Sequence, residues 1–310
     1  MPISAYDIDP SGAATVAGDG PAQRGYRWVQ YSLDDPELPS LAMTLPDIPA
    51  ASLTAPETRP RCEPYGDGVI VNLRGINLND DGPADQMVAV RLWVTKDLVV
   101  TVQARRVRAL DALGQETAEG AAPATPMAFV AQLARKLMRR VRDEVFELSD
   151  RVDGMEDSVV DDGAPLPQAL AEERRMAIRL RRYLGPQRDA LDALVALDSP
   201  LMTEVLRAQL REQANLANLT VEELDALVAR MTAVQDHHTA QAALKQGHNG
   251  YVLSIIAAVF LPLGFVTGLF GVNVAGMPGV ETPWAFAALC AAMIVISVAA
   301  LWGMRRLKWI

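Results

Sequence analysis

The chain has 310 residues and a formal net charge of −9, and its two cysteines, Cys62 and Cys290, have no spacing typical of a disulfide framework. Residues 251–310 carry a net charge of +2, so residues 1–250 carry −11. A polar part this acidic argues against nucleic acid as a partner. No nucleophile motif, P-loop or dinucleotide fingerprint is present, so we do not expect an enzyme.

The first 24 residues are expected to be a disordered lead, because they are rich in Ala, Gly and Asp and lack the apolar core of a signal sequence. Beyond them, β-branched runs with alternating polarity predict four strands, at 26–33, 68–78, 87–95 and 97–107. Two short helices, at 38–45 and 50–57, are expected between strands.

Turn residues separate the predicted strands, and Thr95-Lys96-Asp97 is short enough to join the last two as a hairpin. Residues 25–120 are therefore predicted to form an α/β domain with a mainly antiparallel or mixed sheet.

Long helices are predicted after a linker at 120–124. Thr125 and Pro126 are typical of a helix start, since a hydroxyl caps the first turn and Pro fits there. The amphipathic, highly charged helix that follows extends to about Val160. A second helix is predicted at 166–197.

The second helix is expected to break or bend near Gly185-Pro186. A third helix runs from about 201 to 270 without an evident stop. Residues 121–250 are thus predicted to form a helical stalk domain, and a polar helix this long indicates an oligomer.

The C-terminal part predicts a transmembrane hairpin. Residues 251–270 contain no charge and would span about 30 Å as a helix, the thickness of a bilayer core. An outer loop at 271–283 and a second apolar run at 284–304 follow. Basic residues occur in the tail at 305–310 and at Lys245 but not in the loop. The positive-inside rule therefore places both termini in the cytoplasm.

One side of the first span carries almost only small residues. We call it the small face; it follows alternating steps of four and three residues, the spacing of associating helices. Its members are Asp236, Ala240, Ala243, Gly247, Gly250, Ser254, Ala257, Leu261, Gly264 and Gly268. The face fits close packing between helices. It also fits the wall of a narrow pore in which Leu261 is the constriction. Pro262 predicts a local kink.

Metal-binding side chains are sparse. Neighbouring histidines on a helix point about 100° apart, so His237 and His238 do not easily face one axial site, and they are expected to be solvent-facing, as is His248. Asp236 falls on the small face and is the better candidate to meet a metal ion. Asp161-Asp162-Gly163 lacks the spacing of an EF-hand and predicts a turn.

Gly271-Val272-Asn273 ends the first span. On its own it fits a hairpin turn. In an oligomer, a ring of Asn273 amide oxygens would hold a hydrated divalent ion without trapping it. Glu281 is the only charge of the outer loop, and copies of it would attract cations to the mouth.

These residues carry a family resemblance. The sequence FLPLGFVTGLFGVN (260–273), a short loop and one return span with a basic tail resemble the CorA superfamily of divalent-cation transporters. ETRPRCE (57–63), VNLRGINLN (71–79) and RLWVT (91–95) are similar to runs in its zinc-transporting ZntB branch. The magnesium transporters have Met where this chain has Val272, which favours zinc over magnesium.

The resemblance implies a homopentamer with a cytoplasmic α/β domain, a funnel of stalk helices and two transmembrane helices per subunit. It implies that Asn273 forms a selectivity ring and that Leu261 is a hydrophobic constriction. It further implies that the other residues of the small face from Gly247 to Gly268 line the path, with Asp236 in the funnel. The chain departs from the magnesium branch at Gly247, Gly250 and Gly264, where that branch has bulkier or polar residues.

The function expected is transport of a divalent cation through the inner membrane, with Zn²⁺ as the first choice and no cofactor. Proton coupling is implied by the resemblance alone. The alternatives are a broad channel for Mg²⁺, Co²⁺, Ni²⁺ or Cd²⁺, and a membrane-anchored stalk that acts as a sensor or scaffold and moves no ion. The small face and Gly271-Val272-Asn273 favour transport, because an anchor needs neither.

Overall fold

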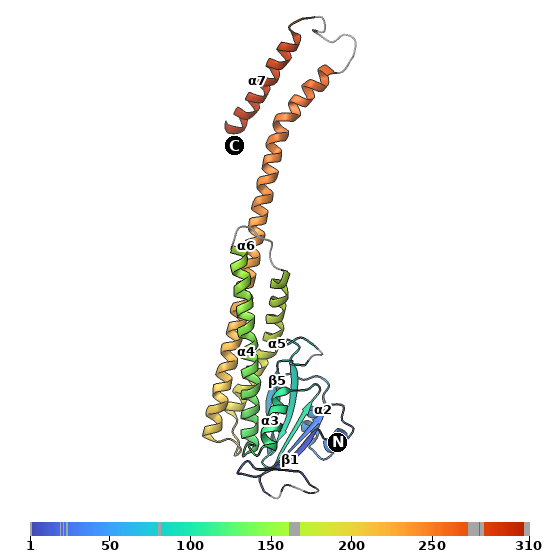
Figure 1. Ribbon diagram of the computed structural model, residues 1–310, viewed down its shortest axis with the longest axis vertical. Helices are drawn as coiled ribbons and strands as arrows, with labels where there is room; N and C mark the ends of the chain where they lie inside the picture. The colour runs from blue at the N-terminus through green and yellow to red at the C-terminus, as the bar shows by residue number, and fades with distance from the viewer. Residues whose placement is uncertain are drawn as a thin grey trace. The chain divides into compact units, whose positions relative to one another are not determined.

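The computed structural model describes residues 2–18, 20, 22, 24–79, 82–160, 168–271, 279 and 282–306. The chain divides into two compact units, residues 1–235 and 236–310. The first unit combines a β-sheet with helices, and the second is helical (Figure 1).

The first unit contains a seven-stranded sheet in the order β2-β1-β3-β7-β6-β5-β4. Only β3 and β7 pair in parallel among the described strands, so the sheet is mixed, as predicted. The predicted hairpin is confirmed between β6 and β7, where the Thr95 hydroxyl accepts from the Leu98 amide at 3.1 Å. The strands are β1 Ser4–Ile8, β2 Ala14–Val16, β3 Tyr26–Ser32, β4 Arg61–Tyr65, β5 Gly68–Gly75, β6 Val88–Val94 and β7 Leu98–Gln103.

The expected disordered lead is wrong for the segments that form β1 and β2. β1 pairs antiparallel with β3, the Tyr6 ring stacks on Trp28 at 6.0 Å, and Ile8 is fully buried. An Arg27–Asp7 ion pair of 2.6 Å joins the same two strands. A composition average over 24 residues concealed these few apolar residues, which gain their partners only when β3 is formed.

Two further elements escaped the sequence analysis. β4 contains Pro64, which weakens a strand pattern but is tolerated at the edge of a sheet, where β4 lies. The helix α3 (Arg108–Ala118) directly follows the last predicted strand and buries Leu110 and Leu113.

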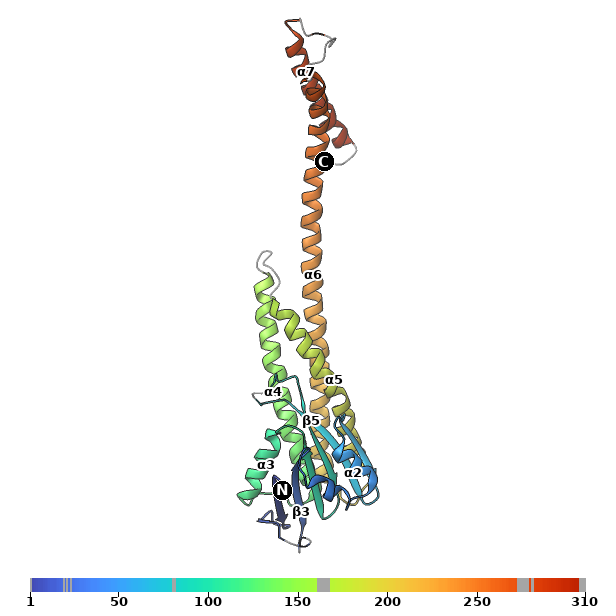
Figure 2. The same cartoon turned by 90° about the vertical axis from the view of Figure 1, so that its right-hand side faces the viewer.

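Helices cover both faces of the sheet, because successive strand residues point to opposite sides. On one face α1 (Leu38–Ala42) and α2 (Asp47–Thr54) bury Leu38 and Leu53 against Ile70, Trp93 and neighbouring valines. On the other face lies the larger core, which β5 enters through Val69, Val71 and Leu73. The helices α3, α4 (Pro126–Val160) and α5 (Gln168–Ala196) and the first part of α6 (Glu204–Gly271) contribute to this core (Figure 2).

The helix boundaries follow local chemistry. α4 begins at Pro126, and the Thr125 hydroxyl accepts from the Ala128 amide at 3.2 Å, as a cap should. α5 continues through Pro186 instead of breaking there. α6 is one helix of 68 residues, in agreement with the predicted uninterrupted third helix. α7 (Ala285–Arg306) occupies the predicted second span.

A buried glutamine joins α5 to the sheet. The ladder between β4 and β5 begins at Arg61 opposite Asn72, so the backbone of Arg74 lies beyond its end. Gln187 binds this backbone where a residue of β4 would otherwise pair with it. Its Oε1 accepts from the Arg74 amide at 2.6 Å, and its Nε2 donates to the Arg74 carbonyl at 2.9 Å. The side chain is only 1% exposed, so water cannot replace these bonds.

We predict that Gln187→Met destabilises the first unit by about 2–5 kcal/mol, because two buried backbone groups lose their partners. In the full-length protein in detergent, differential scanning fluorimetry should show a melting temperature lower by roughly 5–15 °C. Gln115→Met, at an exposed position of α3, is the control and should have little effect. Equal melting temperatures for the two variants would contradict this role of Gln187.

Candidate functional site

The second unit presents two apolar helices without a covering. The C-terminal part of α6 and α7 contain 18-residue windows with mean hydropathies of 2.3 and 2.4, and none of either window is buried. Both helices are long enough to cross a bilayer. A core helix of a soluble protein would be buried by its own chain, so these two surfaces require lipid or other copies of the chain.

The small face is present on the surface of α6. A Cβ atom added at Gly247, Gly250, Gly264 or Gly268 would meet nothing within 4 Å, so packing inside this chain does not require glycine there. Leu261 is 71% exposed. The space beside these residues is therefore open to another helix or to an ion path.

The geometry of a straight helix limits how such a face can be used. A heptad spacing drifts by about 20° per seven residues, so the small face turns by roughly 60° between Gly247 and Gly268. Copies of α6 would have to supercoil to keep it on a common axis. Pro262 supplies no N–H to the carbonyl of Ala258, which loosens the helix next to Leu261.

The hydroxyl groups of the span bond to its own backbone. Ser254 Oγ donates to the Gly250 carbonyl at 2.9 Å, and Thr267 Oγ1 donates to the Leu263 carbonyl at 3.0 Å. Their oxygens keep lone pairs that can face a hydrated ion. Of the two residues only Ser254 belongs to the small face, which is therefore lightly polar without carrying a charge in the span.

The candidate metal ligands do not come together in the described part of the chain. Asp236 is exposed on α6, and His237 Nε2 lies 2.9 Å from Gln241 Nε2. No group of three His, Cys, Asp or Glu side chains that could hold a metal occurs among the described residues. Both cysteines are free, and burial raises the pKa of Cys62 to about 12, which keeps it a thiol at neutral pH.

The selectivity motif is described only at Gly271, the last residue of α6. Val272, Asn273 and Glu281 lie outside the described residues.

The ends of α7 carry residues typical of a membrane boundary. Trp284 is 68% exposed at its start, and the Arg306 guanidinium lies 5.3 Å from the Trp302 ring centre in its last turn. Arg305 also lies in that turn. Tryptophan at both ends and arginine at one end are the distribution expected of a spanning helix.

The first unit holds a cavity that the sequence analysis missed. It has a volume of about 730 Å³, and its lining includes arginines from β5, β6, α5 and the segments before β4 and after β7. Because these residues are far apart in the sequence, no local motif predicts their meeting.

The comparisons with known proteins agree with the fold and the apolar helices. The family model for CorA-like Mg²⁺ transporter proteins matches residues 23–306, so the chain belongs to this family of divalent-cation transporters. A zinc transport protein ZntB of Pectobacterium carotovorum subsp. carotovorum is 32% identical over 314 residues, 99% of this chain and 96% of that protein. A ZntB of Cronobacter sakazakii is 32% identical over 86% of this chain and 81% of its own length.

Solved structures support the same assignment. The full-length CmaX protein is 29% identical, with a TM-score of 0.86 over 99% of this chain and 98% of that one. The CorA magnesium transporter of Methanocaldococcus jannaschii has a TM-score of 0.79 over the whole of both chains at 16% identity, which shows a shared fold. The fold and the family resemblance predicted from the sequence are thereby confirmed.

We predict that the small face meets its counterpart in another copy of the chain. In a background without native cysteines (Cys62→Ser, Cys290→Ala), Ala257→Cys should form intermolecular disulfides on mild oxidation in membranes. Val259→Cys points roughly 200° away on the helix and serves as the matched control. Cross-linking through Val259→Cys and not through Ala257→Cys would show that the opposite face is the interface.

Proposed function

We propose that the chain is one subunit of a homopentameric pore that carries a divalent cation, Zn²⁺ first, across the inner membrane. The observation that carries this proposal is α6 itself. One helix continues from the helical core of the first unit into an apolar span that has a small, uncovered face. Copies of such a helix can surround an axis closely because glycine and alanine let their backbones approach.

The chemistry of the small face suits the passage of a divalent cation more than its tight binding. It offers the Ser254 hydroxyl oxygen, glycine backbone and one bulky apolar residue, Leu261, but no fixed charge within the span. Neutral oxygens can exchange with an ion's water shell without holding the ion tightly. A ring of Leu261 side chains would disfavour water and close the path.

The choice of ion rests on the relatives. The curated proteins similar to this chain along nearly its whole length are named zinc transport proteins, which supports Zn²⁺. The description of the family model names Mg²⁺, which keeps a broader divalent channel as the second candidate. Asn273 is proposed as the outer ring that meets the hydrated ion, with Glu281 attracting cations to it.

The end of α7 supports a topology with both termini on the same side of the membrane. Arg305 and Arg306 lie in its last turn, and a basic helix end favours the cytoplasmic side. We therefore place both termini in the cytoplasm. The described span contains no carboxylate or histidine between Tyr251 and Gly271, so coupling to protons would need a titratable group elsewhere.

Transport of Zn²⁺ by the purified protein tests the proposal. Native mass spectrometry should give five chains per particle, and proteoliposomes should accumulate Zn²⁺ in preference to Mg²⁺. An imposed pH gradient will alter the rate only if protons are coupled. Assembled pentamers that move no divalent ion would favour the sensor or scaffold alternative.

Within that assay, Asn273→Ala should reduce Zn²⁺ uptake by at least tenfold, because the proposed ring of amide oxygens is lost. Asn249→Ala removes an amide from α6 outside the small face and should transport normally. If a correctly assembled Asn273→Ala pentamer takes up Zn²⁺ like the parent protein, Gly271-Val272-Asn273 is only a turn.

Leu261→Asn should raise the leak of ions through the pentamer, because a polar ring no longer excludes water from the constriction. Val259→Asn places the same side chain on the opposite face and should lower stability without a leak. Ion permeability per assembled particle, measured in proteoliposomes at zero voltage, separates the two effects. A leak that is unchanged in Leu261→Asn would place Leu261 away from the path.

A further inference from the structure

The cavity of the first unit has a charge opposite to that of its surroundings. Its described lining contains six arginines and two carboxylates, Glu57 and Asp85, a formal excess of four positive charges. The arginines are Arg59, Arg74, Arg91, Arg105, Arg179 and Arg182. Residues 1–250 as a whole carry −11. An arginine cluster of this kind in an acidic domain is not explained by the general surface charge.

Two of the arginines lie in the cavity wall and have N–H groups without an acceptor among the described residues. Arg91 is 1% exposed; its Nη2 donates to the carbonyls of Ala55 and Pro56, but its Nε and Nη1 are buried without a partner among the described residues. Arg74 donates to the carbonyls of Met87 and Thr58, and its Nε is likewise buried and unpartnered. Buried donors without acceptors are costly, so they point to a ligand that supplies them.

The positive charge in the wall is only partly offset, because the Glu57 carboxylate raises the pKa of Arg74 by less than burial lowers it. Burial lowers the pKa of Arg91, and the nearby Arg74 cation lowers it further. Burial is also the main cause of a lowered pKa at Arg74, whose guanidinium lies 4.2 Å from the centre of the Tyr183 ring. Of the two carboxylates, Asp85 is paired with Arg179 on α5. An anion in the cavity would favour the charged state of both wall arginines.

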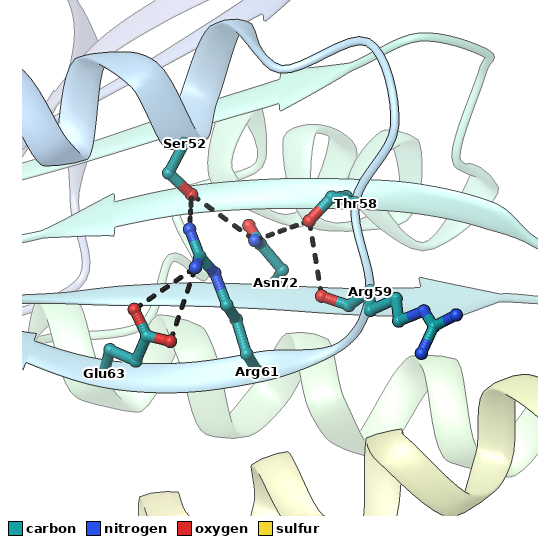
Figure 3. A network of polar contacts seen from close by, with 6 residues as sticks. All are labelled: Ser52, Thr58, Arg59, Arg61, Glu63 and Asn72. Carbon is teal, nitrogen blue, oxygen red and sulfur yellow. Dashed lines mark hydrogen bonds and ion pairs between the residues drawn. The ribbon is translucent and has the colours of Figure 1, made fainter.

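The rim adds two exposed arginines. Neither Arg59 nor Arg182 forms a side-chain hydrogen bond or ion pair among the described residues, although Arg182 lies 5.8 Å from the centre of the Tyr183 ring. Figure 3 shows the contrast with Arg61, which is held between Ser52 and Glu63, whereas the Arg59 guanidinium points away from this network. The two side chains can therefore close on a bound group without breaking an existing bond.

We propose that this cavity binds a soluble polyphosphate anion of the size of a nucleoside diphosphate or triphosphate. Guanidinium groups bind phosphate oxygens through paired, charge-assisted hydrogen bonds, and several of them around one cavity match several linked phosphates. A volume of about 730 Å³ accommodates a small-molecule ligand of that size. The site lies wholly in the first unit and does not depend on ion transport by the second.

Calorimetric titration of the full-length protein in detergent tests the proposal, with ATP, ADP, inorganic tripolyphosphate and adenosine as probes in metal-free buffer. We expect one ATP or tripolyphosphate per chain and no heat from adenosine, which has no phosphate. Bound ATP should also raise the melting temperature of the protein. Absence of both ATP and tripolyphosphate binding up to millimolar concentration, or equal binding of adenosine, would overturn the proposal.

The double variant Arg59→Gln/Arg182→Gln should weaken ATP and tripolyphosphate binding by about tenfold or more, because two charged donors are removed. Both positions are exposed, so the unliganded variant should melt like the parent protein. Arg175→Gln/Arg211→Gln removes the same charge from exposed positions outside the cavity and should bind within about twofold of the parent. Equal losses in the two double variants would mean that ATP only senses the overall charge of the protein.

Discussion

The constraint on which the second unit depends is that α6 cannot cover its own apolar end. The helix has two kinds of surface. Up to Met231 it buries leucines and alanines in the core of the first unit, and from Tyr251 onward none of its apolar side chains is buried. Apolar surface of this extent is unstable in water. Lipid can cover large side chains such as Phe260 and Phe265, but small residues leave grooves that only another helix fills closely. Side-chain size thus favours contact of the small face with another helix, which copies of the chain would supply in the proposed pentamer.

In the first unit, long helices are joined to a mixed sheet. Alternation along β5, β6 and β7 gives two apolar faces, and helices of very different length cover them. Where the ladder of the edge strand β4 ends, the Gln187 amide continues it with the same donor and acceptor pattern as a strand. One side chain therefore fixes both the position of α5 and the edge of the sheet. The arginine cavity is lined by residues of α5 and by Arg74 of β5, whose backbone Gln187 binds, so its geometry depends on the same contact.

Elements with strong periodicity could be predicted from the sequence, and those defined by their partners could not. The long helices, the β6–β7 hairpin and the two apolar spans follow from patterns that are visible within one segment. β1 and β2 depend on pairing with β3, and β4 on its position at an edge that tolerates Pro64. The small face could be read from spacing because all its members lie on one helix. The cavity could not, because Arg74 and Arg182 are separated by more than a hundred residues and meet only in the folded sheet and α5.

The two proposed sites have opposite requirements, because the cavity would bind an anion and the span would conduct a cation. A site that holds an anion gains from buried, fixed charges, since guanidinium groups deprived of water interact strongly with phosphate. A path for a divalent cation cannot use the same means, because a ring of fixed carboxylates in a narrow span would bind the ion too tightly to release it. The span from Tyr251 to Gly271 accordingly contains no charged residue. The cavity wall, in contrast, contains the buried Arg91 and the half-buried Arg74, each with buried N–H groups that lack an acceptor among the described residues. Binding and conduction thus require different residue types. The candidate site of the first unit has charged arginines, and that of the second unit has small, neutral residues.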